Sequence, residues 1–300
     1  YSPTTVCRAC GSQISCDQCD ARMVEHRFIN RLMCHQCGHT KVMPDKCPSC
    51  GIEGKLAVIG PGVERLAEEA QRKFPNAKIS VLSSDLYGSA KSLKAEIQKI
   101  SEGNIDIIIG TQLVAKGHNF PKLRLVGVID ADIGLQGSDL RAAERTYQLV
   151  RQVSGRAGRT NNKGRALIQT YQPEHPVVEA IIKGDDDGFW VSEAKQRKLA
   201  SMPPFGKLVG IIISSTNLDN AMSLAHELKQ NTHPLDILAA KIYGPAPAPI
   251  ARIKGRHRIR FLVKSPRISG LQDAIRNWVS TVSLKGDMRL TIDIDPQSFY

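Results

Sequence analysis

The stretches CRACGSQISCDQC (residues 7–19) and CHQCGHTKVMPDKCPSC (residues 34–50) hold all eight cysteines of this 300-residue chain. The cysteines form four pairs, and two residues separate the members of each pair. A tight turn of this kind brings both sulfurs to one ion, and two such turns complete the tetrahedral shell of Zn²⁺. The sequence therefore predicts two bound Zn²⁺ ions, with these ligands: Cys7, Cys10, Cys16, Cys19, Cys34, Cys37, Cys47 and Cys50.

The spacing of the pairs favours a nested arrangement of the two sites. Only five residues separate Cys10 from Cys16, which is short for two facing turns, whereas the fourteen between Cys19 and Cys34 suit a β-hairpin. We expect an inner ion on Cys16, Cys19, Cys34 and Cys37, and an outer ion on Cys7, Cys10, Cys47 and Cys50. An interleaved cross-brace is the alternative. A segment of about 50 residues needs a metal or another cross-link for its stability, whatever its function. Zinc alone therefore does not indicate the function.

Other residues of the cysteine-rich segment have simpler expected roles. The glycines that follow three of the pairs occupy a position where such turns often need positive φ: Gly11, Gly38 and Gly51. Three histidines are surplus donors beside eight thiolates, and we interpret them as surface or DNA-facing residues: His26, His35 and His39.

The charge of the chain favours a polyanionic partner. The formal net charge is +12, and counting eight thiolates and two Zn²⁺ ions lowers it only to +8. No apolar run approaches the ~18 residues of a membrane span, and the first ten residues lack the pattern of a secretory signal. Paired cysteines without such a signal indicate metal binding in a reducing cytoplasm. The chain lacks an initiating Met, so we expect it to begin inside a longer protein.

From Lys55 to about Gly184 the pattern is that of an α/β domain. Predicted strands, the first over residues 55–60, alternate with amphipathic helices, and the runs IDIIIGT (105–111) and LRLVGVID (123–130) are continuously apolar. Such runs are typical of parallel strands covered on both faces. We expect a doubly wound sheet whose strand-end loops carry the site.

Two strand-end segments carry the candidate site residues of this domain. After the third strand come hydroxyl, amide and basic groups that suit contact with a nucleic-acid backbone, and an ordinary loop is the alternative: Thr111, Gln112, Lys116 and His118. The chain has no G-x-x-x-x-G-K-[ST] phosphate loop, so Asp130 and Asp132 are interpreted as switch-point residues rather than magnesium ligands.

RQVSGRAGRT (151–160) places two cations, Arg156 and Arg159, behind the neutral amide of Gln152 and interleaved with glycines, where all three side chains could meet a nucleotide triphosphate. A solvated basic helix end is the alternative.

The last hundred residues predict a ferredoxin-like domain with a basic hairpin. Strand and helix signals follow the order β-α-β-β-α-β. No acid occurs between Pro245 and Gly270, and period-two alternation is expected to place most of the basic residues there on one face for phosphate contact: Arg252, Lys254, Arg256, Arg258 and Arg260. A merely solvated basic face is the alternative.

The order GTQ, AKGH and ERTYQLVRQVSGRAGR (residues 110–159) resembles the second RecA-like lobe of superfamily 2 helicases. With the upstream cysteines and with QTYQPEHP (169–176), MPPF (202–205) and DIDPQSF (293–299), the chain resembles the C-terminal part of the primosomal replication-restart helicase family along its whole length. One departure is SSDLYGS (83–89), where that family has a basic-acidic run, so the contact that the family makes there is not carried over to this chain.

The resemblance implies roles for these residues. Arg159 would be the arginine finger, Arg156 and Gln152 would contact nucleotide or couple the lobes, and Thr111 and Gln112 would grip the translocated strand. ATP and Mg²⁺ would be bound jointly with a first lobe before Tyr1. The C-terminal domain would bind branched DNA and the single-strand-binding protein.

The predicted architecture is a RecA-like helicase lobe 2 with an inserted two-zinc module and a ferredoxin-like C-terminal domain. The predicted parts are a zinc module (1–54), the lobe (55–185), a helix with a Pro-Pro linker (186–205) and a C-terminal DNA- or partner-binding domain (206–300).

Two functional hypotheses remain open. One is part of a monomeric, bacterial, cytoplasmic and nucleoid-associated 3′→5′ DNA helicase that recognises stalled forks. Its partners would be branched and single-stranded DNA, the single-strand-binding protein, and primosome and replicative-helicase loading proteins. The other is a non-catalytic zinc-containing DNA-binding scaffold.

Overall fold

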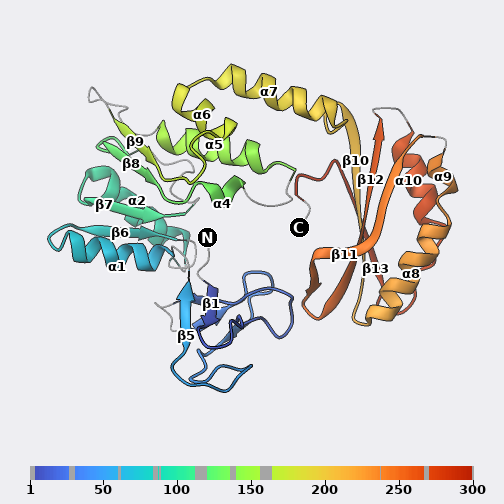
Figure 1. Ribbon diagram of the computed structural model, residues 1–300, viewed down its shortest axis with the longest axis horizontal. Coiled ribbons are helices and arrows are strands. Elements are labelled where there is room, and N and C mark those ends of the chain that lie inside the picture. The colour runs from blue at the N-terminus through green and yellow to red at the C-terminus, as the bar shows by residue number, and fades with distance from the viewer. Residues whose placement is uncertain are drawn as a thin grey trace.

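The computed structural model arranges the chain in three parts, and a long helix joins two of them, the lobe and the C-terminal domain (Figure 1). An α/β lobe lies at the left of the view, a cysteine-rich module lies below it, and the C-terminal domain lies at the right; helix α7 (Asp186–Leu199) runs across the top. The structure describes residues 4–26, 31–59, 62–83, 87, 89–111, 120–135, 140–155, 164–236, 238–266 and 270–298.

The cysteine-rich module is built on short antiparallel strands. Its sheet has the order β4-β3-β2-β1-β5, and its small core consists of Ile14, Met23 and Leu32 packed against buried cysteines. A core of this size cannot hold the strands alone, so the cysteines must contribute to the stability of this part. The strands are β1 (Thr4–Cys7), β2 (Val24–His26), β3 (Arg31–Met33), β4 (Thr40–Lys41) and β5 (Leu56–Ile59).

Strand β5 corrects one prediction. The sequence pattern assigns it to the lobe as the first strand of a doubly wound sheet, but it pairs antiparallel with β1, from Thr4 opposite Ile59 to Cys7 opposite Leu56. The reason is local. Cys7 ends β1, and its sulfur lies 3.8 Å from that of Cys50, so the chain that leaves Cys50 emerges beside β1.

The lobe contains the expected alternation of strands and helices. Among the described residues, its strands form two parallel pairs, β6 with β7 and β8 with β9, rather than one continuous sheet. Clusters around Leu82 and Tyr147 pack helices against these pairs. The elements are α1 (Val63–Lys73), β6 (Ile79–Leu82), α2 (Ala90–Glu102), β7 (Ile107–Gly110), β8 (Leu125–Val128), α4 (Asp132–Leu135), α5 (Ala142–Ser154), β9 (Arg165–Ile168) and α6 (Pro176–Lys183).

The C-terminal domain confirms the ferredoxin-like prediction. Its four strands are all antiparallel in the order β11-β12-β10-β13. Alternate residues of β10 and β12 are buried beneath α8 and α10, and Trp278 of α10 donates its indole N–H to the Leu228 carbonyl at 2.8 Å. The elements are β10 (Gly206–Ser215), α8 (Leu218–Gln230), α9 (His233–Asp236), β11 (Lys241–Ile253), β12 (Arg256–Pro266), α10 (Leu271–Val279) and β13 (Arg289–Ile294).

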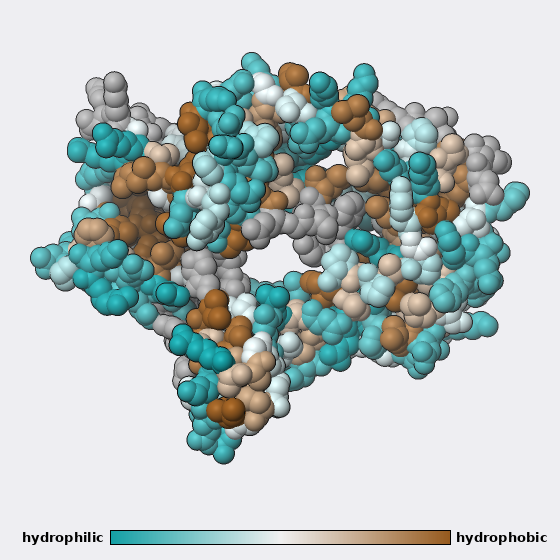
Figure 2. Space-filling view, in the orientation of Figure 1, coloured by the Kyte–Doolittle hydropathy of each residue, from teal (hydrophilic) through white to brown (hydrophobic). Residues whose placement is uncertain are grey.

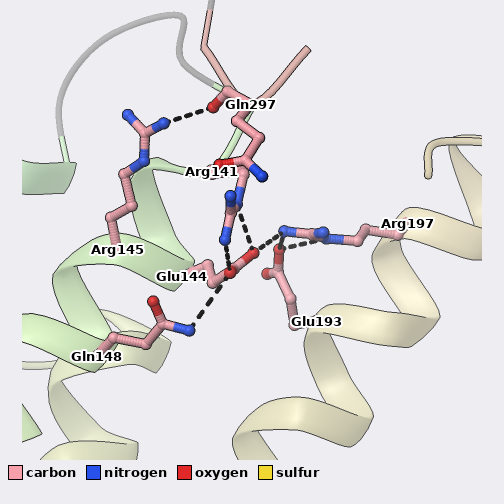
Figure 3. Close-up of polar contacts among 7 residues, drawn as sticks. All are labelled: Arg141, Glu144, Arg145, Gln148, Glu193, Arg197 and Gln297. Atoms are coloured by element: carbon pink, nitrogen blue, oxygen red, sulfur yellow. Dashed lines mark hydrogen bonds and ion pairs between the residues drawn. The ribbon is translucent and has the colours of Figure 1, made fainter. Parts of the chain in front are cut away.

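A buried carboxylate fastens α5 of the lobe to α7 (Figure 3). Glu144 of α5 is 7% exposed and accepts hydrogen bonds from Arg141 and, at 2.7 Å, from Arg197 of α7. The hydrogen bond from Arg141, followed by that from Arg197, lowers the pKa of Glu144. Arg145, one residue further along α5, donates to the backbone carbonyl of Gln297 near the C-terminus. Both ends of the C-terminal domain are therefore tied to α5.

A second carboxylate joins α5 and α7 nearer the C-terminal end of α5. Asp186 in the first turn of α7 accepts two hydrogen bonds from Arg151, at 2.7 and 2.8 Å, and one from the Tyr147 hydroxyl.

Across the part of the chain that the structure describes, no helix combines the length and apolar character needed to cross a bilayer.

Replacing Glu144 with Gln should destabilise the chain markedly. Removing the charge takes the shared anion from two partly buried guanidinium groups, although Arg197 keeps its pair with Glu193, and breaking such a buried pair costs about 3 kcal/mol. Chemical denaturation at neutral pH would measure the loss. The matched control is Glu179→Gln, which breaks only an exposed pair with Lys183 and should cost less than about 1 kcal/mol.

The pH dependence of the stability of the same two variants tests the direction of the pKa shift of Glu144. The folded-state pKa of Glu144 is lowered, so its contribution is fully present above the pKa of an unfolded Glu, about 4.3, and is lost as pH falls through the lower folded value. The stability difference between wild type and Glu144→Gln should therefore shrink only in acid. A difference that is already small at pH 7 would contradict the role given to this carboxylate.

Candidate zinc centres and nucleic-acid interface

The eight cysteine sulfurs gather into two groups of four. Within each group all sulfurs lie within 4.8 Å of one another, and neighbouring sulfurs such as those of Cys10 and Cys47 or Cys16 and Cys37 are 3.7 Å apart. Four sulfurs at 2.3 Å from a tetrahedral Zn²⁺ are separated by about 3.8 Å, whereas a disulfide needs about 2.0 Å. The groups follow the nested rather than the cross-braced pattern: Cys7, Cys10, Cys47 and Cys50; Cys16, Cys19, Cys34 and Cys37.

The turns that present these sulfurs share one geometry. In three of the four, the residue after the second cysteine is a glycine whose N–H donates to the carbonyl of the first cysteine at 2.8–2.9 Å. The predicted positive φ is confirmed, with φ of +74° at Gly11, +79° at Gly38 and +72° at Gly51. Backbone N–H groups also point at the sulfurs: Gln18 donates to Cys16 and His39 to Cys37, each at 3.4 Å.

The two groups differ in their surroundings. Three of the inner sulfurs belong to buried residues, whereas Cys10 and Cys50 of the outer group are exposed. The pKa values do not separate the groups in the same way. In the outer group, the backbone N–H groups of Cys50 and Ser49 lower the pKa of Cys47 to about 6, while burial and the neighbouring thiols raise the pKa of Cys50 to about 12. Burial also raises the pKa of Cys19 in the inner group to about 12. Zn²⁺ binds thiolates, so loading either site must displace protons at neutral pH.

The surplus histidines lie outside both sulfur groups. His26 and His35 stack, with ring centroids 5.1 Å apart and their Nε2 atoms 3.0 Å apart. Nε2 of His39 lies 3.7 Å from Asp17, which also pairs with Lys41 at 3.1 Å.

The C-terminal sheet presents basic residues on the face that carries no helix. Arg258, Arg260 and Lys264 lie opposite Ser214, Ile212 and Leu208 of β10. The β12 side chains that point to the other face, those of Ile259, Phe261 and Val263, are buried under α8 and α10. Those helices lie on the outer side of the sheet, so its helix-free face is turned toward the middle of the molecule (Figure 1). Figure 2 shows an opening there, between this domain, the cysteine-rich module and the lobe.

The predicted basic stripe is only partly correct. Arg256, Arg258 and Arg260 share one face, but Arg252 pairs across the hairpin with His257 and therefore lies on the other face. The cause is the two-residue turn at Lys254 and Gly255, which breaks the period-two count between the strands.

Several of these arginines have partners within the chain. Arg252 lies 3.4 Å from Asp20, Arg256 pairs with Asp287 at 3.0 Å, and Arg258 donates to the Ile250 carbonyl at 3.1 Å. Sequence reasoning missed Asp20 and Asp287 because neither lies near the hairpin in the chain. Hydrogen bonds from Ser215 and Thr216, together with Arg256, lower the pKa of Asp287.

Within the lobe, the structure describes only some predicted site residues. Thr111 is exposed directly after β7, and Gln152 is exposed in the last turn of α5. Gln152 lines a cavity of about 480 Å³ whose wall also includes Arg151 and Trp190. The remaining predicted residues lie outside the described ones: Gln112, Lys116, His118, Arg156 and Arg159.

The strand-end aspartates have structural partners. Asp132 is buried and accepts hydrogen bonds from the Thr170 hydroxyl at 2.7 Å and the Tyr171 N–H at 2.8 Å, just after β9. The Asp130 N–H donates to the Gln169 side chain at 3.2 Å. These contacts join the carboxyl ends of β8 and β9.

Comparison with known proteins identifies three segments. Residues 16–41 match the PriA DNA helicase Cys-rich region domain, residues 47–161 the helicase conserved C-terminal domain, and residues 198–297 the primosomal protein N C-terminal domain. Replication restart protein PriA of Rickettsia conorii is 39% identical over 300 residues, which are 100% of this chain and 46% of that protein.

More distant relatives carry the same name. Replication restart protein PriA of Bacillus subtilis is 35% identical over 303 residues, with 99% of this chain and 37% of that protein aligned, and that of Treponema pallidum is 34% identical, with 99% and 45% aligned. The chain thus spans about half the length of the relatives that it matches, or less.

Metal analysis of the purified chain should give two Zn²⁺ per molecule. Replacing Cys16 with Ser should remove the inner ion alone, because its sulfur belongs to one group only. Zinc would be counted by mass spectrometry of the metal, and folding of the C-terminal domain followed by Trp278 fluorescence in a Trp190→Phe background. Retention of two ions by Cys16→Ser would show that the ligand set is wrong.

Proposed function

Because this chain belongs to the PriA family of replication restart proteins, we propose that it is the C-terminal part of an ATP-dependent 3′→5′ DNA helicase. The helicase recognises stalled or abandoned forks and promotes primosome assembly. The observation that carries the proposal is the order of three matched segments on one chain: the Cys-rich region, the helicase C-terminal domain and the primosomal protein N C-terminal domain. A zinc-containing DNA-binding scaffold would not need the second of these.

In this proposal α5 carries the nucleotide-sensing end of the lobe. Gln152 stands exposed in its last turn, and Arg156 and Arg159 follow in the sequence. Arg159 stabilises the charge on the transferring phosphoryl group, a contribution of roughly 10³–10⁵ in rate in other enzymes. Arg156 and Gln152 contact nucleotide, and ATP with Mg²⁺ binds jointly with a first lobe that supplies the phosphate loop.

DNA contacts are proposed on two surfaces. Thr111, Gln112, Lys116 and His118 follow β7 and would hold the backbone of the translocated strand through hydroxyl, amide and basic groups. Arg260 and Lys264 lie on the helix-free face of the C-terminal sheet and would contact phosphates electrostatically. Further DNA contacts are proposed for Arg252, Lys254, Arg256 and Arg258. Phosphates would compete there with the contacts of three of these side chains to Asp20, Asp287 and the Ile250 carbonyl.

The remaining partners follow from the family. We propose branched DNA, the single-strand-binding protein and the proteins that load the replicative helicase as partners of a monomer that works on the bacterial nucleoid.

Neutralising the helix-free face should weaken DNA binding in a salt-dependent way. The double variant Arg260→Gln, Lys264→Gln removes two cations, so the slope of log K against log salt should fall by roughly one per lost phosphate contact. Fluorescence anisotropy with a labelled single strand would measure it between about 50 and 200 mM salt. The control is Arg276→Gln on α10, which is exposed on the opposite side of the domain and pairs with Asp273. An unchanged slope in the double variant would place the DNA elsewhere.

The helicase proposal is tested on a protein that joins this chain to its phosphate-loop lobe. DNA-stimulated ATP hydrolysis should fall by roughly 10³-fold or more in Arg159→Ala while DNA binding stays intact. Arg72→Ala, in the exposed last turn of α1, should retain full activity. The 300-residue chain alone should bind DNA and not hydrolyse ATP. Hydrolysis that is absent from the joined protein, or indifferent to Arg159→Ala, favours the scaffold.

A further inference from the structure

The tip of the β11–β12 hairpin (residues 252–256, called the hairpin tip below) lies against the turn that carries Cys16 and Cys19. Two backbone hydrogen bonds join them: the Asp20 N–H donates to the Arg252 carbonyl at 2.9 Å, and the Gly255 N–H donates to the Gln18 carbonyl at 2.8 Å. The partners are more than 230 residues apart in the chain. The C-terminal domain thus touches the cysteine-rich module through paired main-chain groups.

A third hydrogen bond reaches a metal-binding sulfur. The N–H of Lys254 donates to Sγ of Cys19 at 3.3 Å. Lys254 has φ of +51° and Gly255 of +75°, the left-handed conformation that both central residues of a tight hairpin turn adopt. When Cys19 is a zinc-bound thiolate, this bond becomes charge-assisted and is among the outer contacts that tune a metal site.

Side chains complete the contact. Ile253 packs against the inner core around Met23 and Leu32, and Arg252 lies 3.4 Å from Asp20. The hairpin tip therefore offers an apolar residue, a cation and three backbone groups to one turn of the inner zinc site.

The receiving surface depends on the metal. Gln18, Cys19 and Asp20 lie in or next to the turn between two ligands of the inner ion, and a module of this size holds such a turn only when its ligands are bound. Whatever binds only the loaded form must in turn oppose loss of the ion, because the two equilibria are linked.

We propose that the hairpin tip is a zinc-dependent latch. The inner Zn²⁺ shapes the turn on which the tip docks, and the docked tip slows release of that ion. Loss of the inner ion frees this end of the C-terminal domain, while the domain keeps its attachment to α5 through α7 and through Arg145. The opening between the C-terminal domain and the cysteine-rich module would then no longer be closed on this side.

Zinc release from the 300-residue chain tests the latch, with the outer ion as an internal reference. Ile253→Asp places a charge against the inner core, and the control Ile292→Asp makes the same change on β13 of the same sheet, away from the turn. A chelator that changes colour on binding Zn²⁺ would follow both ions. We expect Ile253→Asp to accelerate release of one ion about tenfold and to leave the other as in wild type.

Assignment of the ions uses Cys50→Ser, which removes an exposed ligand of the outer ion; the accelerated phase should persist in that background. Equal acceleration of both ions, similar acceleration by Ile292→Asp, or no acceleration would each overturn the proposal.

Hydrogen exchange provides a second readout that needs no variant. Removing both ions should speed exchange of the Lys254 and Gly255 amides, while amides of β10 in the core of the same domain stay protected. Tip amides that remain protected in the zinc-free chain would show that docking does not depend on the metal.

Discussion

Four sulfurs around one ion must lie about 3.8 Å from each other, and this distance organises the part of the chain that has the least core. It brings Cys7 and Cys50 together from the two ends of the cysteine-rich segment, which places β5 beside β1 rather than in the lobe. It also shapes the turn from Cys16 to Cys19 that receives the β11–β12 hairpin. One coordination geometry thus decides a strand pairing and a contact between domains.

Elsewhere in the molecule, two carboxylates hold the lobe to α7: Glu144, which is buried, and Asp186, which is exposed. Glu144 and Asp186 each bind an arginine across the α5–α7 boundary, and α7 leads directly into the first strand of the C-terminal domain. The chain's excess of positive charge is therefore not all available to a polyanion. Arg197, Arg252 and Arg256 are paired with acids of the chain, so the net charge overstates the surface that a nucleic acid would meet.

How much of the structure can be predicted from the sequence depends on how far apart in the chain the interacting residues lie. Cysteine spacing, positive-φ glycines and strand alternation act over a few residues, and they anticipate the sulfur groups and the ferredoxin-like domain. The partner of β5, the face of Arg252 and the contacts of Glu144 depend on residues far away in the chain, and no local pattern encodes them. The hydrogen bond from the Lys254 N–H to Cys19 is the hardest of these contacts to predict from the sequence, because every residue except proline carries a backbone N–H.

That backbone bond has a consequence for how the chain tolerates substitution. The side chain of Lys254 is exposed, and the contact with Cys19 uses only its amide. What position 254 must supply is a left-handed backbone, which Asn, Asp and Gly adopt more readily than Lys does. Substitutions to those residues keep the contact between the domains, whereas β-branched residues and proline work against the conformation or remove the donor. The residue type at position 254 is therefore restricted by the backbone conformation that it must adopt, whereas the charge of its side chain can change without loss of the contact.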